Sequence, residues 1–254
     1  MFISCKFEFS LNPSFFIYLF FKIIPRSSQV CAFEISDLFK APSDSTLKPR
    51  LKSKEKYYNW YENNFCVLPD GNTLIGANYS LLKSEDITGN RFKIVIDQKR
   101  NHISTIIFNL NLNLLLVGDE DGCLSQYGRN PSGDFKKQKD YGDVGVGEIF
   151  DIDWSGNFAV VGGTKGKISL IDMKKRKVIA NGVRAAIGYI YFLRLCRISE
   201  SEMHLAVGGG GKDYSKSKTD LFDVSKLFNL RENKEENVKT IKKELIEQVK
   251  SISE

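Results

Sequence analysis

Four consecutive glycines at residues 208–211, followed by Lys212, are the residues most suggestive of phosphate chemistry. Exposed amide groups in a glycine-rich loop can bind phosphate oxygens. A P-loop, however, needs a lysine and a hydroxyl side chain directly after its last glycine, at the start of a helix. Here Asp213 follows Lys212, and the flanking residues favour strands. The glycine run therefore indicates a hairpin that needs permissive backbone angles, not a nucleotide site.

Carboxylates and histidines offer little further chemistry. Asp119, Glu120 and Asp121 are consecutive, whereas a calcium loop of the EF-hand type spreads its ligands over about 12 residues and closes with a glutamate. A solvated turn is the expected structure of this segment. The two histidines, His102 and His204, do not form a nucleophile–base pattern with other residues. We therefore expect no catalytic, metal-binding or cofactor-binding residues, no cofactor, and a protein that is not an enzyme.

Cysteine usage and apolar runs bear on the compartment. Five scattered cysteines form no CxxC pair, which argues against a disulfide framework and for a reducing compartment. Residues 15–24 are strongly apolar but include Lys22, and a membrane-spanning helix needs about 20 apolar residues. Glu8 and the segment IPRSS fit a signal peptide poorly. We expect a cytoplasmic protein in which residues 1–27 form extra strands or reflect a misassigned start of the gene product.

The elements that must position any site recur along the chain. Apolar runs end in Gly76, Gly118, Gly162 and Gly208, which are separated by 42, 44 and 46 residues. Propeller blades repeat at about 40–45 residues. Before each glycine lie a strand-like run and a polar turn, and after it come a tight turn and further strand-like runs. Four antiparallel strands per repeat are typical of a propeller blade.

Two segments carry a resemblance to a known family. Residues 117–128 read VGDEDGCLSQYG and residues 161–172 read VGGTKGKISLID. Both resemble the WD40 repeat, whose consensus is a small residue, Gly, a turn, a strand and then a Trp-Asp pair. Tyr127 and Ile171 stand where that family has the Trp, and Asp172 stands where it has the Asp. The resemblance covers roughly residues 60–228 and implies a β-propeller fold, while it says almost nothing about function. It also implies structural roles within the blades for Gly76, Gly118, Gly162, Gly208, His102, Asp121, Tyr127 and Asp172, with His102, Asp121 and Tyr127 joined in one network.

The repeats define the expected domain boundaries. Residues 59–228 hold the WD40-like blades, and residues 28–58 hold a partial blade and a basic linker. Residues 229–254 place apolar side chains at intervals of three and four, which predicts an amphipathic helix. The expected fold is an all-β propeller of about four to five blades with this short C-terminal helix. Whether the ring closes by itself, is truncated, or is completed by another chain stays open.

The expected function is that of a non-catalytic scaffold for one or more protein partners. In the resembled family the turns between second and third strands share one face, and a long insertion at residues 209–218 enlarges it here. The partner-binding residues expected on this face are Asp119, Glu120, Lys165, Lys212, Asp213 and Tyr214. Self-association through the C-terminal helix or an open propeller edge is a further expected contact.

Charge supports one alternative function. The chain carries a net charge of +6, and residues 1–58 hold nine Lys and Arg against five Asp and Glu. Within residues 48–61, five alternating basic residues precede four aromatic ones. Such an arm can bind nucleic acid or an anionic membrane surface. The alternative is a solvated linker that leads into a strand.

Overall fold

The chain is an all-β protein built from antiparallel sheets. The computed structural model describes residues 17–24, 27–34, 51–52, 65–68, 73–77, 80–84, 92–97, 101–186, 188–199, 202–211 and 217–225. Each sheet has three or four strands. The chain divides into two compact units, one of residues 1–103 and 108–113, the other of residues 104–107 and 114–254. The predicted helical tail at 229–254 lies outside the described residues.

The first unit contains two sheets. One has the order β1-β2-β3 and the other β4-β5-β6-β7. Gly76 lies within β5, where its Cα partner on β6 is Leu81. The strand bounds are β1 Ile17–Ile24, β2 Ser27–Glu34, β3 Leu51–Lys52, β4 Phe65–Val67, β5 Thr73–Ala77, β6 Ser80–Ser84 and β7 Phe92–Asp97.

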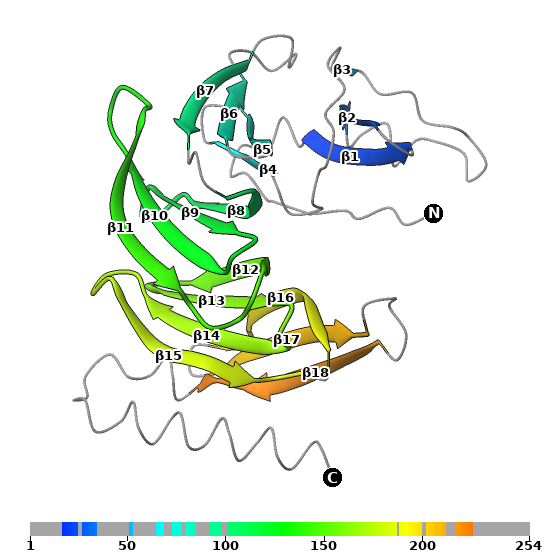
Figure 1. Ribbon diagram of the computed structural model, residues 1–254, viewed down its shortest axis with the longest axis vertical. Helices are drawn as coiled ribbons and strands as arrows, with labels where there is room; N and C mark the ends of the chain where they lie inside the picture. Colours follow the sequence, from blue (N-terminus) through cyan, green and yellow to red (C-terminus); the bar gives the residue numbers. More distant parts are fainter. Residues whose placement is uncertain are drawn as a thin grey trace. The chain divides into compact units, whose positions relative to one another are not determined.

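Three more sheets follow along the chain, with the orders β11-β10-β9-β8, β12-β13-β14-β15 and β16-β17-β18 (Figure 1). The predicted unit of four consecutive strands is therefore confirmed for β4–β7, β8–β11 and β12–β15. The bounds are β8 Ile103–Asn109, β9 Leu114–Asp119, β10 Cys123–Arg129, β11 Phe135–Asp143, β12 Ile149–Ser155, β13 Phe158–Gly163, β14 Lys167–Asp172, β15 Lys177–Arg184, β16 Tyr189–Arg197, β17 Met203–Gly210 and β18 Lys218–Asp223.

The last sheet differs from the prediction of a hairpin at the glycine run of residues 208–211. β17 continues to Gly210, so the glycine run belongs to a strand rather than to a hairpin turn. β18 pairs directly with β17 and is the third strand of this sheet. Gly208 and Gly209 have no positive φ, so permissive backbone angles do not explain them. A Cβ on Gly209 would instead lie 2.7 Å from the Cβ of Ala186, so close packing is the reason for a glycine.

The repeated glycines set the spacing between neighbouring sheets. A Cβ on Gly118, in β9, would lie 2.8 Å from Cγ2 of Ile149, in β12. A Cβ on Gly162, in β13, would lie 2.9 Å from Cγ2 of Ile190, in β16. In these two sheets the second strand thus meets the first strand of the next sheet at a glycine. Since real Cβ atoms do not approach this closely, any larger residue would push the sheets apart.

A buried apolar layer joins the last two sheets. Its side chains come from β13, β14 and β15 on one side and from β16, β17 and β18 on the other. The first strands also contact across the sheets, β12 with β16. Each Å² of apolar surface that is removed from water contributes about 25 cal/mol to stability, so this layer is a major stabilising contact between the two sheets. The buried members include Val160, Ile168, Leu170, Ile190, Leu193, Leu205, Val207 and Phe222.

Candidate functional site

Two turns between second and third strands meet the linkers that lead into the next sheets. In the β9–β10 turn, the carbonyl of Gly122 accepts a hydrogen bond from the amide of Val144 at 3.0 Å. In the β13–β14 turn, the carbonyl of Gly166 accepts from the amide of Ala185 at 2.9 Å. Lys165 donates its amide to the Val146 carbonyl, also at 2.9 Å. These turns, residues 120–122 and 164–166, and linkers, residues 144–148 and 185–186, are called the turn face below.

Glycines make this close approach sterically feasible. Gly122 and Gly166 have φ values of +83° and +65°, which L side chains rarely adopt. A Cβ on Gly122 would lie 2.6 Å from the carbonyl oxygen of Gly147, and one on Gly166 would lie 2.4 Å from that of Gly188. The turn face therefore has a tightly hydrogen-bonded backbone, from which side chains project.

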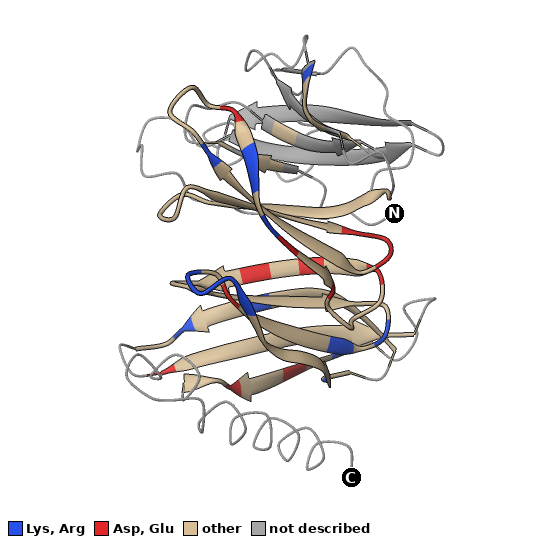
Figure 2. Cartoon of the chain, turned by 60° about the vertical axis from the view of Figure 1, so that its left-hand side comes forward, with Lys and Arg blue, Asp and Glu red and all other residues tan. Residues whose placement is uncertain are grey.

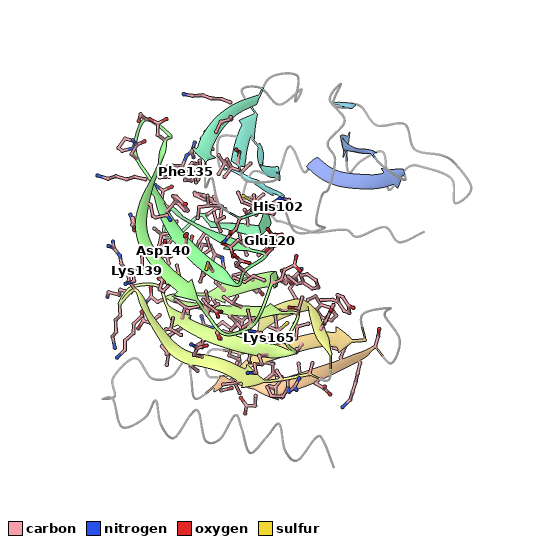
Figure 3. The ribbon with its side chains drawn as sticks, viewed as in Figure 1. His102, Glu120, Phe135, Lys139, Asp140 and Lys165 are labelled. Atoms are coloured by element: carbon pink, nitrogen blue, oxygen red, sulfur yellow. The ribbon has the colours of Figure 1, made fainter. Side chains whose placement is uncertain are left out.

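The predicted partner-binding residues divide by exposure. Glu120 and Lys165 are exposed on the turn face. They lie on the side of the second unit away from Lys139 and Asp140 of β11 (Figure 3). Asp119 is only 6% exposed, and its Oδ1 accepts the amides of Asp121 at 3.1 Å and Cys123 at 2.8 Å. Asp119 therefore shapes the turn, while Lys212, Asp213 and Tyr214 lie outside the described residues.

The residues assigned to blade structure have varied environments. Asp121 is exposed, and the turn aspartate that accepts backbone hydrogen bonds is Asp119. Tyr127 is buried in β10, with Nζ of Lys137 5.7 Å from its ring centroid. Asp172 is buried and accepts the amide of Lys175 at 2.8 Å, which stabilises the β14–β15 turn. His102 lies just before β8 and is partly buried, and its network with Asp121 and Tyr127 stays a prediction.

An aromatic cluster that the sequence interpretation missed lies at the start of two first strands. The ring centroid of Phe150 is 5.8 Å from that of Tyr189 and 6.0 Å from that of Tyr191. The Tyr191 hydroxyl donates to the carbonyl of Gly211 at 2.5 Å, at the beginning of the predicted insertion. All three rings are partly exposed. Aromatic side chains on a rigid frame are preferred anchors of protein interfaces.

Two aspartates of β12 were also missed, the buried Asp151 and the partly buried Asp153, and both accept hydrogen bonds from β16. Asp151 is fully buried, and its Oδ2 accepts both the amide of Leu193 and Nη1 of Arg194, each at 2.8 Å. Oδ2 of Asp153 accepts the amide of Leu195 at 2.7 Å. The signal was available in the sequence, because two aspartates alternate with apolar residues in the short strand-like run IFDIDW.

Burial perturbs several titratable groups. Desolvation raises the pKa of Asp153 above its ordinary value, although the Leu195 amide and the charge of Arg194 act in the opposite direction. Desolvation likewise raises the pKa of Tyr141 to about 12. The Tyr141 hydroxyl donates to Oε1 of the buried Gln126 at 2.6 Å, so it serves structure. Desolvation and four neighbouring aspartates raise the pKa of the Cys123 thiol, which disfavours a reactive thiolate.

Among the described residues, no group of at least three His, Cys, Asp or Glu side chains could hold a metal ion. Cys66, Cys123 and Cys196 take part in no disulfide. Within the same ranges of the chain, no helix combines the length and the apolar character needed to cross a membrane.

Comparisons with known proteins show no family for this chain. No family model matches the chain, and no curated protein matches it. One similar solved structure is that of the computationally designed Ika4 protein, at 12% sequence identity and a TM-score of 0.45. That match covers 70% of this chain and 99% of the designed protein. What the chain shows is a class, an all-β protein of antiparallel sheets with three or four strands each.

Proposed function

We propose that this chain is a WD40-like propeller whose blades are the successive sheets of the structure. The support is the repeated environment of the glycines, because Gly118 and Gly162 each meet the first strand of the following sheet. Neighbouring sheets also share side-chain hydrogen bonds, such as that from Ser104 Oγ to the Ile149 carbonyl at 2.6 Å. The sheets β8–β11, β12–β15 and β16–β18 thus contact one another in succession through equivalent strands, as blades do in a propeller.

We further propose that the protein is a non-catalytic scaffold that binds a protein partner on the turn face. One observation carries this proposal. Glu120 and Lys165 are exposed there on a rigid hydrogen-bonded backbone, and the partly exposed cluster of Phe150, Tyr189 and Tyr191 lies at the strand ends that the linkers lead into. Rigid aromatic anchors beside charged residues match the composition of protein interfaces.

Affinity purification of the tagged full chain from native extract tests this proposal. Wild type is compared with a charge-swapped variant of the turn face, Glu120→Lys with Lys165→Glu. Ile198→Ser is the matched control, because Ile198 is 58% exposed in the β16–β17 hairpin, at the other end of the strands. A second variant replaces residues 212–216 with a short Gly-Asn turn. Equal melting temperatures show that each variant still folds.

The proposal expects a defined set of proteins that survives nuclease and moderate salt. The charge-swapped variant and the variant with residues 212–216 replaced should both lose these proteins, and Ile198→Ser should retain them. Loss with Ile198→Ser alone would place the interface at the other end of the strands and overturn the proposal. Recovery that disappears with nuclease would instead favour the basic arm at residues 48–61 as the site.

A further inference from the structure

Two basic segments that are far apart in the sequence lie together in the second unit. Strand β11 carries three lysines, and the β14–β15 turn with the first residue of β15 carries four basic residues. Figure 2 shows basic positions along β11 and at the β14–β15 turn on the same flank. The basic surface is defined here as the exposed residues Lys136, Lys137, Lys139, Lys174, Lys175, Arg176 and Lys177.

A direct hydrogen bond joins the two segments. Nη2 of Arg176 donates to Oε1 of Gln138, in the middle of β11, at 3.2 Å. Oε1 of Gln138 also accepts from Nε2 of the buried Gln126 at 3.2 Å. The β14–β15 turn is therefore held against β11 by side chains that are themselves anchored in the sheet.

Little acidic charge offsets this surface. Lys137 pairs with Asp140 at 3.1 Å, and both side chains are about half exposed. None of the described carboxylates forms an ion pair with Lys136, Lys139, Lys174 or Lys175. Unpaired cations on one flank create a positive potential that attracts a partner of opposite charge.

The edge of β11 favours a polypeptide as that partner. Among the described strands, β11 pairs only with β10, so its other edge offers backbone amides and carbonyls. An extended peptide can satisfy these groups as an added strand. Nucleic acid cannot form such a ladder, and it also prefers exposed aromatic rings for stacking. The aromatic residues of β11, Phe135 and Tyr141, are partly buried, and the Tyr141 hydroxyl is bonded to Gln126.

We propose that the basic surface binds an acidic, extended segment of a protein partner, which lies along the free edge of β11 and pairs its carboxylates with the lysines. Edge lysines usually prevent strands from pairing across molecules, because approaching strands meet a desolvated positive charge. Carboxylates on an incoming strand pair with the lysines, so the cost of desolvating an unpaired positive charge is removed. The same lysines therefore exclude ordinary strands and select an acidic one.

The experiment uses the full chain and two fluorescent probes, a short peptide of alternating glutamate and threonine and a single-stranded oligonucleotide of similar charge. Fluorescence anisotropy measures the dissociation constant of each probe at low and at high salt. The test variants are Lys136→Glu with Lys139→Glu, and Lys174→Glu with Lys175→Glu. Lys93→Glu is the matched control, because it removes an exposed lysine of β7 that belongs to neither the basic surface nor the turn face. Backbone hydrogen exchange of β11 is followed with and without the peptide.

The proposal expects the glutamate peptide to bind and to slow exchange at β11 amides that do not bond to β10. Each double variant should weaken binding at least about tenfold, while Lys93→Glu leaves it nearly unchanged. Tighter binding of the oligonucleotide than of the peptide would overturn the proposal in favour of a nucleic-acid surface. Equal weakening by Lys93→Glu, or unchanged exchange at β11, would also overturn it. These outcomes do not depend on the turn face.

Discussion

Gly162 shows how one missing side chain determines the distance between two sheets. Its hydrogen atom faces Ile190 and Leu193 of β16, both fully buried. The φ value of Gly162 lies in the range that any residue can adopt, so the requirement is for space alone. The same argument applies to Gly118, which faces Ile149.

Substitution of Gly162 should therefore follow side-chain size. We expect Gly162→Ala to destabilise the protein and Gly162→Val to destabilise it more, by about 1–3 kcal/mol, because the added atoms overlap Ile190 and Leu193. Equilibrium unfolding in urea measures both free energies. Wild-type stability of the valine variant would contradict the close approach of β13 and β16.

Asp153 links stability to pH. Its pKa is raised in the folded protein, mainly by desolvation, so the folded state keeps a proton at pH values where the unfolded state has lost it. The contribution of Asp153 to stability is present below the ordinary carboxyl pKa and is lost as the pH rises through the raised value. Asp153→Asn removes this titration and keeps an amide oxygen that can accept from Leu195.

The difference in unfolding free energy between wild type and Asp153→Asn should accordingly fall as the pH rises through the acidic range. Thermal or urea unfolding at several pH values gives this difference. Asp140 has a lowered pKa and remains in both proteins, so its opposite contribution cancels in the comparison. A difference that rises with pH would show that Asp153 is not desolvated in the folded state.

At the scale of elements, β12 and β16 are joined by side-chain hydrogen bonds as well as by apolar packing. Asp151 accepts two hydrogen bonds from β16. In the neighbouring strand β14, the Ser169 hydroxyl donates to the Val144 carbonyl, in the linker between β11 and β12, at 2.5 Å. Ser169 Oγ also accepts the Gly182 amide at 2.8 Å. Buried polar groups of this kind orient the sheets because each needs its particular partner.

Asp151→Ala should destabilise the protein by about 2–3 kcal/mol, since the buried Leu193 amide loses its acceptor. Arg194 is 42% exposed, so its loss of the carboxylate adds less. Urea unfolding measures the change, and a double-mutant cycle with Arg194→Ala separates the two contributions. A change under about 0.5 kcal/mol, typical of an ordinary surface substitution, would contradict this role of Asp151 in joining β12 to β16.

At the scale of the whole molecule, the final sheet stands apart from the others. β10 and β14 are third strands that are covered by β11 and β15, and their central residues are buried. β18 occupies the same place beside β17, yet Leu221 is 59% exposed and no other described strand pairs with it. A fourth strand over β18 would complete the pattern of the preceding sheets.

Hydrogen exchange can show whether such a strand exists in solution. Amides of β18 that do not bond to β17 should exchange faster than the corresponding amides of β10 and β14, because no described strand covers them. The comparison within one molecule controls for its global stability. Slow exchange at these amides would mean that a segment outside the described residues, or a second copy of the chain, pairs with β18.

Much of the strand framework could be predicted from local residue patterns. The spacing of Gly76, Gly118, Gly162 and Gly208 marked the second strands, because apolar runs and turn residues repeat around them. The site was less predictable. Asp119 looked like an exposed contact but is buried, since its carboxylate folds back onto the amides of its own turn. A sequence does not show which of several adjacent carboxylates will accept those bonds.

The sequence by itself determined the all-β class, the order of the strands and the positions of the repeated glycines, because each depends on local periodicity and turn chemistry. The tertiary structure alone decided which distant residues meet. It joined Lys139 to the neighbourhood of Arg176, Phe150 to Tyr189, and Asp151 to Arg194, through the packing of one sheet on the next. Such contacts depend on the distance and angle between sheets, which buried side chains from several strands determine together.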